Sequence, residues 1–108
     1  MKVWLDDELP MPDGYDQHVK TSVEAIALLV NERVRLISLD HDLGEERNGS
    51  GYDVAKFIEQ AAYMGTISPI VVRIHSANPV GRARMEQAIA RAQEFWARRV
   101  YSAWLPGC

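Results

Sequence analysis

The chain has 108 residues, of which 47% are hydrophobic and 25% charged, and its formal net charge is −3. This length and composition are typical of one globular domain, residues 1–108, and no apolar stretch approaches the roughly 20 residues of a membrane span, so we expect no membrane partner. We expect a cytoplasmic protein, because an apolar run begins within two residues of Met1 and the lone Cys108 can form no internal disulfide.

Apolar runs alternate with turn signals in the first half of the chain. In chain order, we predict a strand over residues 3–5, an irregular loop over 9–15, a short edge strand over 17–20, a helix from 21 or 22 to about 31, and a buried strand over 36–39. Pro10 and Pro12 predict the loop, since neither fits a helix interior. Thr21 and Glu24 have the spacing of a capping box, which predicts the start of the helix.

The second half follows the same alternation. We predict a turn-rich loop over 44–51, a helix over 52–64, a strand over 70–74 and a helix from 79 to about 100. Pro79 lies where proline is tolerated, in the first turn of a helix. The apolar stripe of this helix should face the sheet and consists of Met85, Ile89, Ala92, Trp96 and Val100. Residues 101–108 form either a short last strand, a packed tail or a surface for self-association, so we consider a homodimer through the last helix and tail.

This pattern predicts an α/β fold: a mostly parallel sheet of about four to five strands with helices on both faces. The first crossover, residues 9–15, is a loop in place of a helix, so one face should be thinly covered there. Arg73 interrupts an apolar strand and either has a buried carboxylate partner or lies on this thinly covered face.

Acidic residues follow two of the predicted strands: Asp6, Asp7 and Glu8 after the first, and Asp40 after the strand over 36–39. The carboxyl ends of parallel strands meet at one edge of a sheet, where ligands gather in open α/β folds. Any one of these carboxylates alone would be explained by capping or ion pairing. Together they would repel one another, and a divalent cation is the simplest compensation. We therefore predict a metal site at Asp6, Asp7 and Asp40, with Mg²⁺ expected and Mn²⁺ as the alternative.

Histidines accompany these acids at the same edge. His41 follows Asp40, and His75 follows the strand over 70–74. Because histidine titrates near neutral pH, the pair suits general acid and base roles in phosphoester cleavage, whereas each one alone would be as well explained as a structural residue. His18, on the predicted edge strand, is expected at the surface.

Three further residues near the last helix are candidates for binding phosphate. Ser76 offers a hydroxyl, and Asn78 lies at a helix N-terminus, which favours anions but also requires an N-cap. Arg82 belongs to a group of five arginines on the last helix, which either attract an anion or form an ordinary solvated face. The group consists of Arg82, Arg84, Arg91, Arg98 and Arg99.

Several of these strings together resemble the cyclic-phosphate processing receiver domains, a family similar in fold to response-regulator receivers. The matching strings span Lys2 to about Ala90 and are residues 3–8, 19–21, 38–44, 51–55 and 75–81. The resemblance implies a receiver-like (flavodoxin-like) fold in which Asp6 and Asp7 bind metal, Asp40 takes the phosphoacceptor position and Ser76 the hydroxyl position. No lysine follows Lys56, so the phosphate-contacting lysine of receivers has no counterpart, and Arg82 or His75 would have to supply the charge.

Three functions compete at this point. The first is a metal-dependent phosphoesterase acting on cyclic phosphates, such as 2′,3′-cyclic ends of RNA or cyclic nucleotides, with Asp40, His41 and His75 as catalytic residues. The second is a receiver-type phosphoacceptor or degenerate signalling module without turnover. The third is an interaction protein that uses the arginine-rich last helix and the tail. The name of the family that the chain resembles favours the first function, the phosphoesterase.

Overall fold

The computed structural model describes the backbone of residues 1–104 and the side chains of residues 1–99. The helices and strands are, in chain order, β1 (Lys2–Leu5), β2 (Gln17–Val19), α1 (Ser22–Asn31), β3 (Leu36–Leu39), the 3₁₀ helix η1 (Glu46–Asn48), α2 (Gly51–Met64), β4 (Val71–Ile74) and α3 (Pro79–Trp104). The four strands form one parallel sheet in the order β2-β1-β3-β4. The predicted parallel receiver-like fold is therefore confirmed, including the loop that replaces the first crossover helix.

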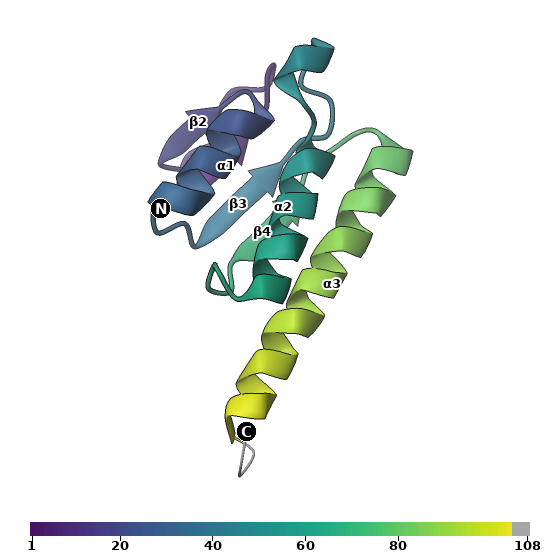
Figure 1. Ribbon diagram of the computed structural model, residues 1–108. Coiled ribbons are helices and arrows are strands. Elements are labelled where there is room, and N and C mark those ends of the chain that lie inside the picture. Colours follow the sequence, from purple (N-terminus) through teal and green to yellow (C-terminus); the bar gives the residue numbers. More distant parts are fainter. Residues whose placement is uncertain (105–108) are drawn as a thin grey trace.

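Helices α1, α2 and α3 all lie on the same face of the sheet (Figure 1). The expectation of helices on both faces is wrong for residues 1–104, and crossover handedness explains why. The connections β2–α1–β3 and β3–α2–β4 run in the same direction across the sheet, so right-handed crossovers place both helices on one side. Only the connection from β1 to β2 runs the other way, and residues 9–15 contain no helix.

Alternate strand residues separate the two faces of the sheet. Val3, Leu5, Ile37 and Leu39 are completely buried and join the side chains of all three helices in one core cluster. The other face carries Trp4, Leu36 and Ser38 in the central strands and the exposed Arg73 on the edge strand. Of the two predicted explanations for Arg73, the structure therefore supports the second: the residue lies on the thinly covered face and needs no buried carboxylate partner.

Local signals set the helix starts at the carboxyl edge of the sheet. The Thr21 side chain accepts a hydrogen bond from the backbone N–H of Glu24, and Ser50 with Asp53 forms a complete capping box at α2. Asn78 caps α3 by accepting a hydrogen bond from the N–H of Gly81 at 3.0 Å. These caps fix the loops that carry the acidic residues and the histidines.

Helix α3 extends well past the sheet (Figure 1). Its predicted stripe is buried at Met85, Ile89, Ala92 and Trp96, whereas the side chain of Val100 lies outside the described ones. The helix continues through Trp104, so a last strand beginning at 101 is wrong, and residues 105–108 lie outside the described part. A dimer through the last helix and tail stays a prediction. None of the helices in residues 1–104 has the length and apolar character that crossing a membrane requires.

Candidate metal and phosphate site

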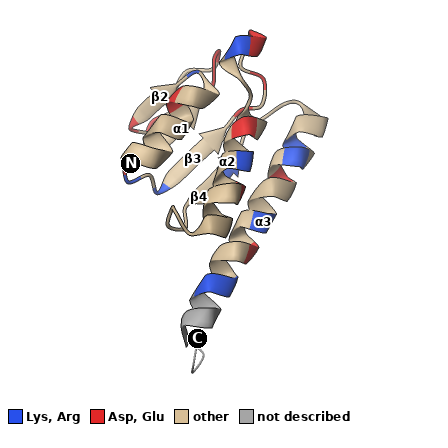
Figure 2. Cartoon of the chain, viewed as in Figure 1, with Lys and Arg blue, Asp and Glu red and all other residues tan. Residues whose placement is uncertain are grey.

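Three carboxylates converge at the carboxyl edge of the central strands. Asp6 and Asp7 follow β1 and Asp40 follows β3, its hydrogen-bonded neighbour, so the sheet itself brings them together. One carboxylate oxygen from each lies within 4.8 Å of the others. Figure 2 shows acidic positions around this end of the sheet, whereas α3 carries both basic and acidic positions along its length.

Asp6 is the buried member of this group, with 1% of its surface exposed. Its Oδ1 accepts hydrogen bonds from the backbone N–H groups of Glu8 and Leu9, both at 2.8 Å, and its Oδ2 accepts one from His75 Nε2 at 2.9 Å. Burial raises the pKa of Asp6, but the two N–H groups and His75 outweigh it, and the net pKa is lowered. Asp6 is therefore held ionised in a fixed orientation.

Asp40 experiences the opposite balance. Burial raises its pKa, and the charge of Asp6 raises it further, against the lowering effects of the His41 N–H and the His75 charge. Its Oδ1 accepts a hydrogen bond from the N–H of His41 at 2.8 Å, whereas its Oδ2 has no hydrogen-bond partner among the described side chains. Oxygens left available on carboxylates that repel one another are the ligands that a hard divalent cation prefers. The donor set therefore fits Mg²⁺ or Mn²⁺.

His75 lies beside Asp40 at the end of the neighbouring strand. The strand register pairs Leu39 with Ile74, and the N–H of His75 continues the ladder by donating to the carbonyl oxygen of Leu39 at 3.0 Å. The next residue pair is therefore Asp40 and His75, which places an imidazole where the resemblance assigns the hydroxyl of Ser76. Both ring nitrogens of His75 have protein partners, Asp6 and Ser38.

A cavity of about 550 Å³ opens over this group. It is lined by Asp6, Asp7, Glu8, Leu9, Asp40, Asp42, Gly44, His75 and Ala77. Five of these nine residues are acidic, and neither lysine nor arginine is among them. The cavity lining is thus strongly acidic.

His41 is not among the residues that line this cavity. Its Nδ1 lies 2.9 Å from Asp42 Oδ1, and a Cβ at Gly81 would overlap the imidazole ring. The hydrogen bond from His41, and a weaker one from Asn78 Nδ2 at 3.4 Å, lower the pKa of Asp42. Asp42, which does line the cavity, is therefore held by two of the predicted site residues.

The side chains of Ser76, Asn78 and Arg82 are engaged locally. Ser76 Oγ accepts a hydrogen bond from the N–H of Asn78 at 3.1 Å, and Asn78 Oδ1 caps α3. Arg82 pairs with Glu86 and donates from a terminal guanidinium nitrogen to the carbonyl oxygen of Ile74 at 3.2 Å. None of the three lines the cavity, although Ala77 between them does. Their phosphate-binding role stays a prediction.

Two residues beside the site were not singled out from the sequence. Ser38 contacts the His75 imidazole, and Trp4 stacks on it with ring centroids 3.8 Å apart and planes 5° from parallel. A signal for Ser38 did exist, because a hydroxyl in the middle of the apolar run 36–39 needs a hydrogen-bond partner once it is buried. Trp4 gave no such signal, since a tryptophan in a strand is ordinary core.

Comparison with known proteins gives one family and one solved structure. The family model described as cyclic-phosphate processing receiver domain matches residues 1–91. The solved structure is the signal receiver domain of a protein described as a Luxo repressor from Vibrio parahaemolyticus, with 20% sequence identity and a TM-score of 0.46 over 93% of this chain and 95% of that chain. No curated protein matches the chain.

Proposed function

The chain belongs to the cyclic-phosphate processing receiver domain family, and from this premise we propose that it is a metal-dependent phosphoesterase that hydrolyses cyclic phosphates. The proposed substrates are 2′,3′-cyclic phosphate ends of RNA or cyclic nucleotides. The observation that supports this most directly is the convergence of Asp6, Asp7 and Asp40 under an open cavity.

Asp6, Asp7 and Asp40 would hold the cation. A bound Mg²⁺ or Mn²⁺ supplies charge neutralisation to a phosphate oxygen and lowers the cost of bringing an anion to an acidic edge. Asp6 is oriented by the turn at residues 6–9 and by His75, whereas Asp7 and Asp40 keep oxygens available. The protein thus contributes one fixed ligand and two less constrained ones.

The charge of the cavity bears on how substrate and product would be held. A cyclic phosphodiester carries one negative charge, whereas the phosphomonoester formed from it carries about 1.5 to 2 at pH 7. The five acidic residues and the absence of lysine and arginine from the described lining make the second charge costly. A monoester product, which is more negative than the diester, would be repelled and released.

In the proposed step, a water oxygen bonds to phosphorus, the bond from phosphorus to one ring oxygen breaks, and the proton lost by water ends on that oxygen. His41 is the proposed proton carrier and would act through a water molecule, since it does not line the cavity. Its Nδ1 is held by Asp42, while Nε2 has no hydrogen-bond partner among the described residues. A histidine held in this way at one nitrogen can exchange a proton at the other.

The test is release of phosphomonoester from a 2′,3′-cyclic nucleotide, with a 3′,5′-cyclic nucleotide beside it. It is run with Mg²⁺, with Mn²⁺ and with chelator, on wild type, Asp7→Asn, Asp40→Asn and the control Asp13→Asn, which changes an exposed acid outside the cavity. We expect metal-dependent turnover that falls at least about 100-fold in Asp7→Asn and Asp40→Asn and is unchanged in Asp13→Asn.

A receiver-type phosphoacceptor gives a different result in the same samples. Wild type would show no turnover on either nucleotide, and acetyl phosphate would phosphorylate it in a way that Asp40→Asn abolishes. That outcome would replace the phosphoesterase by a signalling module and leave His41 without a catalytic role.

A further inference from the structure

The side chain of His75 is held on three sides. Nε2 lies 2.9 Å from Asp6 Oδ2, Nδ1 lies 2.7 Å from Ser38 Oγ, and the ring stacks on Trp4. Trp4 is fixed in turn, since its Nε1 donates to the carbonyl oxygen of Leu9 at 3.2 Å. His75 therefore has one position and neither ring nitrogen is left for a substrate.

The partners determine which nitrogen of the neutral ring carries the proton. A carboxylate only accepts hydrogen bonds, so Nε2 must donate its N–H to Asp6. Nδ1 is then the acceptor, and the hydroxyl of Ser38 donates to it. Without this hydroxyl, Nδ1 would lack its donor, and only Asp6 and the stacked Trp4 would hold the ring, so His75 would hold the Asp6 carboxylate less firmly.

The position of Ser38 makes this contact its only evident purpose. Ser38 lies in a central strand, is 2% exposed and points to the face of the sheet that carries no helix in residues 1–104. A buried hydroxyl is destabilising unless it is hydrogen-bonded, and an apolar residue would fill the same place in the strand. It does not line the cavity, so it cannot contact substrate directly.

We infer that Ser38 is a positioning residue for the candidate metal site. It acts through His75, whose function is then to hold the Asp6 carboxylate in place; His75 does not carry protons for the substrate. Outer hydrogen bonds of this kind orient the groups that bind a metal, and their loss weakens metal affinity by roughly 10- to 100-fold. The inference rests on the proposed cation site. It also changes the role of His75, which the sequence predicted to be catalytic.

The test measures the imidazole and the cation separately, without substrate. Nitrogen NMR of the metal-free protein at alkaline pH, where imidazole rings are neutral, reports the His75 tautomer. Mn²⁺ titration followed by electron paramagnetic resonance gives the dissociation constant. The variants are Ser38→Ala, Ser38→Thr, which keeps the hydroxyl, and the control Ser22→Ala, which removes another buried hydroxyl, on α1.

We expect wild type to show one tautomer, protonated at Nε2, with a hydrogen bond accepted at Nδ1. Ser38→Ala should keep this tautomer, lose the nitrogen shift of a hydrogen-bonded Nδ1 and bind Mn²⁺ about tenfold more weakly. Ser38→Thr should restore both properties, and Ser22→Ala should change neither. A Ser38→Ala protein with the wild-type Nδ1 shift and Mn²⁺ affinity would overturn the inference. Should this variant not fold, Ser38→Cys, a weak donor of similar size, takes its place. Absent Mn²⁺ binding in wild type would instead refute the cation site, while the NMR comparison would still decide the role of Ser38.

Discussion

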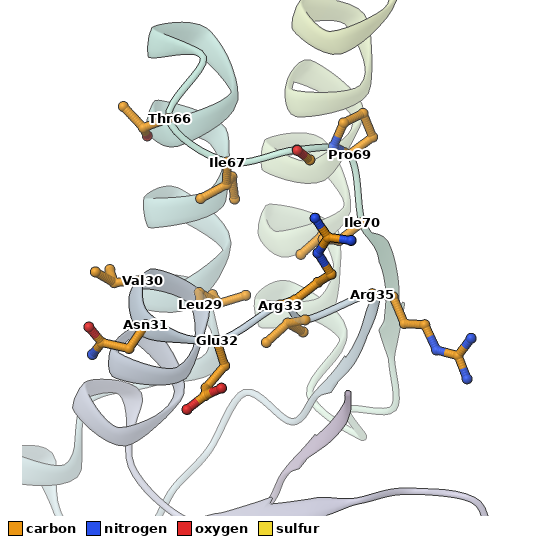
Figure 3. A pocket seen from close by; sticks show the side chains of 12 residues that line it. Leu29, Val30, Asn31, Glu32, Arg33, Arg35, Thr66, Ile67, Pro69 and Ile70 are labelled. Atoms are coloured by element: carbon orange, nitrogen blue, oxygen red, sulfur yellow. The ribbon is translucent and has the colours of Figure 1, made fainter.

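Cavities of similar volume open at the two ends of the sheet, about 550 Å³ at the carboxyl end and about 580 Å³ at the other. The larger one lies between the end of α1 and the loop that precedes β4, and its lining includes Leu29, Ile67, Arg33 and Arg35 (Figure 3). Arg33 and Arg35 extend in different directions there. At the carboxyl end, by contrast, Asp6, Asp7 and Asp40 bring their oxygens to one point.

The difference teaches that volume alone does not distinguish the candidate site from the other cavity, whereas the arrangement of charged groups does. Parallel strands end together, so the loops that follow them place polar groups side by side at the carboxyl end. At the other end, the loops that enter the strands bury Val34, whereas their polar side chains, such as Arg33, Arg35 and Ser68, are exposed. Changes at the carboxyl end should therefore affect stability strongly, and equivalent changes at the other end weakly.

The largest expected effect comes from the same substitution at the two ends of α2. A Cβ at Gly51 would overlap the backbone carbonyl oxygen of Asp40, which cannot move without the strand. Gly65, at the other end, has a φ of 72°, and a Cβ there would meet the flexible guanidinium group of Arg99. We expect Gly51→Ala to lower the free energy of unfolding by about 3 kcal/mol and Gly65→Ala by about 1 kcal/mol.

Chemical denaturation of the two variants beside wild type measures this difference. Equal losses would mean that the two ends are equally adaptable, contrary to the comparison. The slope of free energy against denaturant should be the same in all three proteins, since the surface exposed on unfolding is unchanged.

A smaller effect, of opposite sign, is expected for charge at the two ends. Asp40→Asn removes the repulsion from Asp6 and Asp7, so the metal-free variant should be more stable than wild type by about 1 kcal/mol, the energy of two unit charges about 4 Å apart in water. Glu32→Gln, the same change in the lining of the larger cavity, should alter stability by less than about 0.5 kcal/mol.

The pH dependence of the Asp40 effect has a definite sign. The folded-state pKa of Asp40 lies above its unfolded value, so the charged carboxylate destabilises the folded protein fully above the folded-state pKa. As pH falls toward the unfolded value, Asp40 becomes protonated and the advantage of Asp40→Asn should vanish. Thermal unfolding of metal-free protein between neutral and acidic pH tests this, and an advantage that grows on acidification would contradict it.

The sequence predicted the convergence of carboxylates because that depends only on strand order and direction. Asp6 and Asp40 each follow an apolar strand, and in a parallel sheet both must reach the same edge. The parallel fold, the loop in place of the first crossover helix and the start of each long helix were predictable for a similar reason, since periodicity and capping are local in the sequence.

What the sequence did not predict depends on register and on competing partners. Ser38 meets His75 only because β3 and β4 pair in one register, which no local pattern specifies. Ser76 and Asn78 were predicted to bind phosphate, yet both side chains accept hydrogen bonds from backbone N–H groups of their own turn. To predict that α1, α2 and α3 lie on one face, the strand order would have had to be known, and it was not predicted.

The smallest expected effects belong to the larger cavity. Arg33→Ala and Arg35→Ala should each change the free energy of unfolding by less than about 0.5 kcal/mol, as exposed substitutions usually do. The backbone carbonyl oxygen of Arg33 accepts a hydrogen bond from the amino terminus, and this bond survives the substitution. Hydrolysis of a 2′,3′-cyclic nucleotide should also be unchanged, because both side chains lie at the end of the sheet away from Asp40. A tenfold loss of turnover in either variant would mean that the phosphate binds at this end of the sheet, because arginine is the better partner for phosphate. The functional cavity would then be the larger one, contrary to the comparison.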